Sequence, residues 1–176
     1  VRVEVTGTDA ANVLTELSGS YLKIHMREGN YRRVEAKVYV TYVKLEKLSA
    51  SSAGSIFSEG MIKGDQMEIS ASSAGSVEVT LDVKSLVVDA SSAAEIELKG
   101  KAVELEAEAS SAAQIDAYDL EAAAIEADVS SGASMKLNVV QDLQAHASSG
   151  GSIRYRGNPG KSFTNASSGG SVRKSE

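Results

Sequence analysis

The chain has 176 residues and a net charge of −6, and aromatic residues make up only 5% of its sequence. No apolar run reaches the roughly 18–20 residues of a membrane-spanning helix, and the acidic balance argues against general nucleic-acid binding. The absence of cysteine excludes disulfides and thiolate metal sites. We therefore expect one domain with a thin core of Ala, Val, Ile and Leu.

Residues 1–49 contain the first strand-like stretches, VRVEV, YLKIHM and VEAKVYVTYVKLEKL. We expect them to form the first coils or an N-terminal cap, because longer and more aromatic strands can cover backbone groups left unpaired at the end of a repeat array. No basic segment followed by an apolar one opens the chain. We therefore expect that an export leader has been removed or lies outside this sequence.

A short motif recurs through residues 50–176. Seven copies of Ala-Ser-Ser-Ala, or of a variant ending in Gly, begin at residues 50, 71, 90, 109, 129, 147 and 166. Their starts are separated by 21, 19, 19, 20, 18 and 19 residues. A nearly fixed period in this range predicts a solenoid, in which each repeat packs only on its neighbours.

Apolar and polar residues alternate between the motifs. Leu86, Val88 and Ala90 fall on one face of a strand, and Ile96 and Leu98 fall on one face of the next. Period-two alternation predicts half-buried strands, and it outweighs the helix propensity of the Ala- and Glu-rich segments. The sequence thus predicts an all-β fold, a single-stranded right-handed parallel β-helix (β-solenoid) with about 19–20 residues per coil. Residues 1–176 are expected to form a single β-solenoid domain, with the seven repeats in residues 50–176.

The recurring serines are predicted to occupy tight corners between strands, where small residues fit. A catalytic serine would need a neighbouring base, yet the chain has only two histidines, His25 and His146. A serine pair repeated seven times is also a poor candidate for a single nucleophile. We predict no catalytic residue, no cofactor and no bound metal.

Stacking the coils in register predicts two outward columns of charged side chains. The middle coils of these columns suggest an acidic patch for a divalent cation or a basic partner, made of Glu97, Asp116, Glu108 and Asp128. Separately, the segment RYRGNPGK at 154–161 suggests a basic turn that could contact an anionic glycan or a lipid head group through Arg154, Arg156 and Lys161. The simpler interpretation is solvated charge that keeps the solenoid soluble. Oxygen ligands suit Ca²⁺, but a flat column offers few of the six to eight that this ion takes, so weak binding at best is expected.

Three segments carry a resemblance to a known family. The run LxVxASSAAxIxL, the segment SGSYLKI at 18–24 and the closing SSGGSIRYRGNPG at 148–160 resemble the putative auto-transporter adhesin "head GIN" domain family of Bacteroidetes. The resemblance implies a β-helical fold, export to the periplasm, outer membrane or cell surface, and an adhesive role. It implies no catalytic motif.

The predicted function is a non-enzymatic, exported, adhesin-like binding or structural module. Its ligand would be a glycan, a protein or a lipid head group, and the oligomeric state is left open. A polysaccharide lyase or hydrolase is one alternative, although coils of such even length leave little room for the loops that build a cleft. A structural spacer within a surface assembly is the other.

Overall fold

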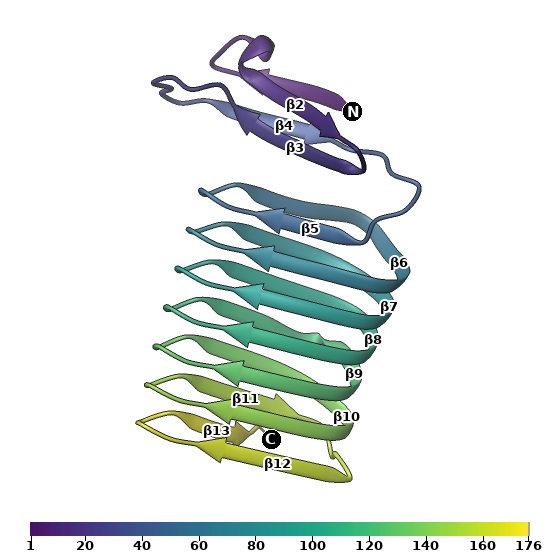
Figure 1. Ribbon diagram of the computed structural model, residues 1–176, viewed down its shortest axis with the longest axis vertical. Coiled ribbons are helices and arrows are strands. Elements are labelled where there is room, and N and C mark those ends of the chain that lie inside the picture. Colours follow the sequence, from purple (N-terminus) through teal and green to yellow (C-terminus); the bar gives the residue numbers. More distant parts are fainter. Residues whose placement is uncertain (176) are drawn as a thin grey trace. The chain divides into compact units, whose positions relative to one another are not determined.

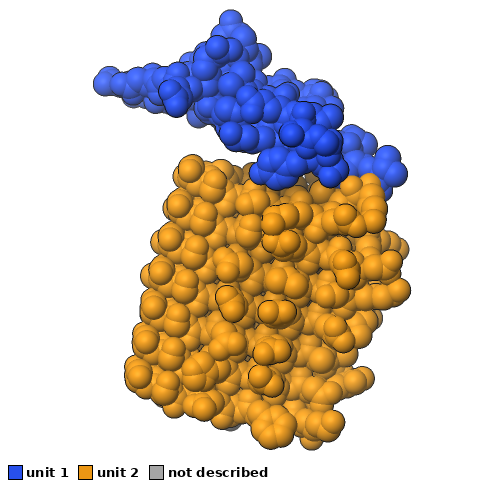
Figure 2. Space-filling view, in the orientation of Figure 1, with its two compact units in different colours: residues 1–43 blue, residues 44–176 orange. Residues whose placement is uncertain are grey.

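The computed structural model describes residues 1–175. The chain forms two compact units, residues 1–43 and residues 44–176, which Figure 2 shows in different colours. The described residues contain thirteen β-strands, one short 3₁₀ helix and no α-helix.

Residues 44–176 form a parallel stack of coils, as predicted. Its strands, in chain order, are β5 (Lys47–Ala50), β6 (Ser55–Ala71), β7 (Ser76–Ala90), β8 (Glu95–Ala109), β9 (Gln114–Val129), β10 (Ser134–Ala147), β11 (Ser152–Arg156), β12 (Lys161–Ala166) and β13 (Ser171–Lys174). Consecutive strands from β5 to β11 pair in parallel, β12 pairs with β10, and β13 pairs with β11. The chain winds through these strands as a right-handed coil (Figure 1). The predicted solenoid of about 19 residues per coil is therefore confirmed.

Each long strand bends sharply near its middle, so that every coil has two layers (Figure 1). We call the part before the bend the first arm and the part after it the second arm; in β7 these are residues 76–83 and 85–90. In the last turns the β-strand is interrupted at the bend, so β11 and β13 are first arms and β12 is a second arm.

The core fills the space between the two arms. In β7, Val77, Val79 and Leu81 of the first arm and Leu86 and Val88 of the second arm are at most 1% exposed. The same inward positions in β6–β10 are also filled by aliphatic side chains, which form one continuous cluster. No polar or charged side chain is buried anywhere in residues 1–175. Burial of this aliphatic cluster is the main force that holds the coils together.

The Ala-Ser-Ser corners close by a tight turn of one type. At the first corner the amide of Gly54 donates to the carbonyl of Ser51 at 2.9 Å, while Ser52 and Ala53 have φ values of 53° and 60°. Two successive positive φ angles inside such a turn define type I′. The same pattern recurs at all seven corners, with Gly replacing the alanine in the last three. A positive φ costs a residue with a Cβ about 1–2 kcal/mol, so the glycines of the last three corners avoid part of this cost.

Corners of adjacent coils are joined through the backbone. The amide of Ala53 donates to the carbonyl of Ser73 in the next coil at 3.1 Å, and equivalent bonds link the later corners. The predicted structural role of the serines is thus carried by their main-chain groups and by the turn they form.

Two glycines with a positive φ lie where the chain turns from a first arm toward a second arm, and the first of them is Gly100 in β8. This residue has a φ of 108°, and a Cβ built on it would lie 2.0 Å from the carbonyl oxygen of Leu81 in the coil before. Gly157, which follows β11, has a φ of 105° and would place a Cβ 1.9 Å from the carbonyl oxygen of Val139. Glycine is required at both bends because only it allows this backbone angle and this close approach.

Residues 1–43 are built differently. The strands β1 (Arg2–Thr6) and β4 (Glu35–Tyr39) pair antiparallel, as do β2 (Val13–Ser18) and β3 (Tyr21–Met26). The 3₁₀ helix η1 (Ala10–Asn12) is capped by the Asp9 side chain, which accepts from the amide of Ala11 at 2.9 Å. These four strands are not turns of the parallel stack, which begins at β5. That residues 1–49 cap a single domain of residues 1–176 stays a prediction.

Candidate functional site

The strand registers place the outward side chains in straight columns. The first-arm column runs through Phe57, Glu78, Glu97, Asp116, Lys136, Arg154 and Arg173. The second-arm column runs through Ser49, Ser70, Asp89, Glu108, Asp128, His146 and Asn165. Both columns match those expected from stacking the repeats in register.

The two columns lie on opposite outer faces, because the core separates the first arms from the second arms (Figure 1). Glu97 and Asp116 are neighbours in register on the first-arm face, and Glu108 and Asp128 are neighbours on the second-arm face. The structure therefore brings together two pairs of the predicted acidic residues and does not bring the four together.

Carboxylates on the first-arm face are paired with lysines. Lys99 lies 2.7 Å from Glu78 and 2.8 Å from Glu97, and Lys136 lies 2.7 Å from Asp116. The hydrogen bonds that Lys99 donates to Glu78 and Glu97 raise the pKa of Lys99, and the hydrogen bond that Lys136 donates to Asp116 raises the pKa of Lys136. The two lysines offset two of the three negative charges in the acidic part of the first-arm column.

The second-arm face keeps its negative charge in the middle coils. At its N-terminal end, Lys47 pairs with Glu68 at 2.5 Å and Lys84 pairs with Asp65 at 2.7 Å. Further along, seven carboxylates form no ion pair with any lysine or arginine in residues 1–175: Asp89, Glu104, Glu106, Glu108, Glu126, Asp128 and Asp142.

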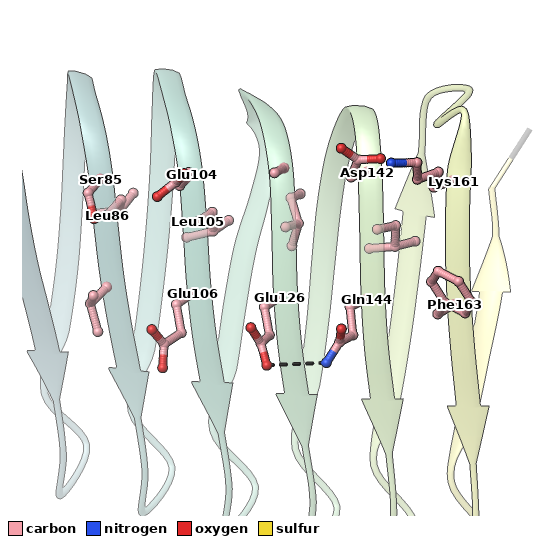
Figure 3. A pocket seen from close by; sticks show the side chains of 14 residues that line it. Ser85, Leu86, Glu104, Leu105, Glu106, Glu126, Asp142, Gln144, Lys161 and Phe163 are labelled. Carbon is pink, nitrogen blue, oxygen red and sulfur yellow. Dashed lines mark hydrogen bonds between the residues drawn. The ribbon is translucent and has the colours of Figure 1, made fainter.

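A shallow groove of about 400 Å³ runs across the second arms of β7–β10 and β12 (Figure 3). Glu106 and Glu126 stand beside each other along it, and the Gln144 amide donates to Glu126 at 3.3 Å. Phe163 lies at the end of the groove and is 72% exposed. In residues 1–175 no three His, Asp or Glu side chains converge as a metal site would require. The groove thus offers a charged, open surface and no enclosed reaction centre.

The predicted basic turn is divided by the bend at residues 157–160. Arg154 and Arg156 lie in β11 on the first-arm face, whereas Lys161 begins β12 and is paired in register with Asp142. The structure therefore keeps Arg154 and Arg156 together and places Lys161 in a second arm.

Tyr118 is the residue that the sequence interpretation missed. It lies in β9 where the register with the flanking strands shifts, and its ring has Lys136 at 5.6 Å and Arg156 at 5.1 Å from the centroid. Its hydroxyl lies 2.7 Å from the Ser175 hydroxyl, and Arg156 donates to its carbonyl. The one signal in the sequence was an aromatic residue in a coil of 20 residues, longer than its neighbours by one or two.

This solenoid of Ala-Ser-Ser corners, with flat charged faces, matches a known domain family. Residues 1–159 match the family described as "Putative auto-transporter adhesin, head GIN domain". The chain belongs to this family. Its membership confirms the resemblance seen in the sequence, and it implies export. No curated protein is detectably similar in sequence to this head GIN domain.

Three solved structures share the fold of this head GIN domain. A putative adhesin from Bacteroides fragilis has a TM-score of 0.86 at 20% identity, covering 98% of this chain and 82% of its own. A putative adhesin from Parabacteroides merdae has a TM-score of 0.77 at 17% identity, covering 99% and 83%. A putative lipid binding protein from Parabacteroides distasonis has a TM-score of 0.62 at 20% identity, covering 94% and 80%. At these identities the likeness establishes a common fold.

The head GIN domain has no helix, within residues 1–175, with the length and hydropathy needed to cross a bilayer.

Proposed function

We propose that this head GIN domain is a non-enzymatic binding module that presents the rigid outer faces of its solenoid to a ligand in the periplasm, in the outer membrane or at the cell surface. The observation that carries the proposal is the division between an interior without buried polar or charged side chains in residues 1–175 and straight outward columns of charge. Charged groups held on neighbouring strands stay about 4.8 Å apart, which suits a repetitive or extended ligand.

Rigidity supports a binding role. Every coil from β6 to β10 is hydrogen-bonded to its neighbours along both arms and through its corner. Side chains on such a scaffold lose little backbone freedom when a ligand binds, so less of the binding energy is spent on ordering.

The absence of a cleft in the described residues argues against the alternative of a polysaccharide lyase or hydrolase. Glycoside hydrolysis needs two carboxyl groups that flank one bond, one of them with a raised pKa. Here the face of residues 44–176 in view in Figure 2 shows even rows of side chains and no deep hollow. No long loop rises beside the groove, because the coils differ by at most three residues in length.

The composition of the last coil argues against the alternative function, a structural spacer whose copies stack end to end. The inward positions occupied by Leu143 and Ala145 in β10 are taken by Ser162 and Thr164 in β12. Polar residues at these positions give little apolar surface to bury against another solenoid end. Light scattering across a concentration range tests this, and concentration-dependent growth of the particle would favour the spacer.

The experiment that tests the proposed function combines binding and turnover. The chain is immobilised and exposed to panels of neutral and anionic glycans, outer-membrane proteins and lipid vesicles, and each ligand it retains is then incubated with the chain in solution. We expect saturable binding of at least one class and no release of oligosaccharide. Reproducible release of oligosaccharides would identify an enzyme instead, and no saturable binding to any class would contradict a binding role.

A further inference from the structure

Positive charge is concentrated at one end of the first-arm face. The first arms of β10, β11 and β13 carry five basic side chains and, through residue 175, no aspartate or glutamate. Four of them point outward and are called the basic cluster: Lys136, Arg154, Arg156 and Arg173. Lys174 is paired in register with the inward Tyr155. The cluster lies at the opposite end of the same column from Glu78 and Glu97.

Only part of this charge is neutralised within the described residues. From β9, Asp116 pairs with Lys136 at 2.7 Å, and Asp119 lies 3.3 Å from Arg156. Arg154 and Arg173 form no ion pair with residues 1–175, although both are exposed. They are also directly opposed in register on β11 and β13.

Two like charges directly opposed on adjacent strands destabilise a sheet. Their juxtaposition here brings no compensating contact within the described residues, whereas Lys99 and Lys136 on the same face each contact a carboxylate. A ligand that supplies negative charge between Arg154 and Arg173 would relieve the repulsion, so this position favours anion binding.

The chemistry of the side chains specifies the anion. Guanidinium groups are planar and bind carboxylate, sulfate or phosphate groups through two parallel hydrogen bonds. Successive cations in the column lie on strands about 4.8 Å apart, so they can contact successive charged groups of an extended polymer. Arg156 is held against the Tyr118 ring and carbonyl, which orders one edge of the cluster before any ligand arrives.

We propose that the basic cluster binds an anionic polysaccharide that runs along the solenoid axis, with Arg154 and Arg173 as its principal contacts. This inference rests on the proposed binding function and names its ligand class. A bilayer fits less well, because the cluster has no large apolar side chain beside Arg154 or Arg173 to insert among lipids; the exposed Val140 lies at the bend. Duplex nucleic acid fits less well, because the chain carries a net charge of −6.

The test uses polygalacturonate as a carboxylated probe, dextran sulfate as a sulfated probe and unmodified dextran as the neutral reference. The double variant Arg154→Gln/Arg173→Gln removes the opposed guanidinium groups. The double variant Lys63→Gln/Lys101→Gln is the matched control, because it removes the same charge from exposed lysines of β6 and β8 that form no ion pair within residues 1–175. Thermal unfolding of each variant confirms that the fold is retained.

We expect wild-type binding to at least one polyanion, weaker binding with increasing salt and none to dextran. The arginine variant should lose about tenfold in affinity, since each exposed charge contact contributes a modest amount and two are removed. The lysine control should change by less than about twofold, because it lies outside the cluster. A variant with Arg154→Lys and Arg173→Lys should be intermediate, because it keeps the charge and loses bidentate geometry.

Equal losses in the arginine variant and the lysine control would overturn the inference, because binding would then follow net charge alone. Tighter retention by vesicles of phosphatidylglycerol than by either polyanion would also overturn it. If the chain binds no polyanion but binds another ligand, the inference fails and the proposed binding function stands. If it binds and also cleaves a polyanion, the proposed non-enzymatic function fails and the inferred site stands.

Discussion

Replacing Gly100 by alanine perturbs a close backbone approach at the bend of the solenoid. The new Cβ would lie 2.0 Å from the carbonyl oxygen and 3.0 Å from the carbonyl carbon of Leu81, which belongs to the coil before. Neither atom can move as a flexible side chain would, because both are part of a backbone that is hydrogen-bonded into the sheet. The bend must therefore open, and the pairing of β7 with β8 must be disrupted locally.

The size of the effect follows from two separate costs. A positive φ costs a residue with a Cβ about 1–2 kcal/mol. Shifting the carbonyl of Leu81 by about an ångström also weakens one or two backbone hydrogen bonds, each with a net contribution of about 1 kcal/mol. We expect Gly100→Ala to lower the free energy of unfolding by about 3 kcal/mol, or the melting temperature by roughly 6–12 °C for a chain of this length.

Two other glycines separate these costs. Gly132 has a φ of 72°, but a Cβ added to it would meet nothing within 4 Å, and Gly60 has neither a positive φ nor a neighbour within that distance. Gly132→Ala should therefore show the backbone cost alone, which the chain already tolerates at the equivalent Ala112 with its φ of 61°. Gly60→Ala should change stability by less than about 1 kcal/mol.

The assay is denaturant unfolding followed by the far-ultraviolet circular dichroism of the β-structure, with the midpoint compared among the three variants. The expected order of stability is Gly60→Ala, then Gly132→Ala, then Gly100→Ala. Equal midpoints for Gly100→Ala and Gly132→Ala would refute the reasoning, because the contact with Leu81 would then carry no cost.

Three further changes test the packing and the faces. Ala109→Leu should cost about 1–3 kcal/mol by overpacking an inward position that is 3% exposed, and an unchanged melting temperature would show that Ala109 does not point inward. Tyr118→Leu should cost about 1–2 kcal/mol and speed amide exchange in β11 and β13, whereas Tyr118→Phe should cost at most about 1 kcal/mol; equal effects would show that the ring contacts contribute nothing. Glu106→Gln should stabilise the fold by up to about 0.5 kcal/mol at low salt, because Glu106 faces Glu126 in register, and the gain should vanish at high salt; a gain that persists in salt would exclude charge repulsion as its cause.

The period and the alternation of the sequence were enough to predict the parallel stack. Stacked coils must repeat the same inward positions, and Ala90, Ala109 and Val129 fill one of these columns because each heads the same motif. The corners were equally readable, since the recurring small Ser, Ala and Gly residues favour a tight turn. The coil length, the inward set and the outward columns are therefore local properties, fixed by strand pleating and turn chemistry.

The division of the surface into two faces was decided by the tertiary structure. Alternation separates inward from outward residues, but it does not say on which side of the core an outward residue lies. That depends on where each strand bends, and only β8 and the turn after β11 mark the bend with a glycine of positive φ, Gly100 and Gly157. The bends of the other coils follow their neighbours through pairing, so no local signal records them.

Side-chain contacts between residues of different coils could likewise not be predicted from the sequence and were seen only in the tertiary structure. Arg156 reaches Tyr118 across 38 residues, because the register shift in β9 turns that side chain toward the later strands. The antiparallel pairing of β1 with β4 likewise joins segments whose alternation also fits a coil. The sequence by itself determined what repeats along the solenoid axis, since each coil meets the same local constraints as the next. Only the tertiary structure decided which side chains are neighbours around that axis, because this depends on strand bends and register shifts that are set by packing.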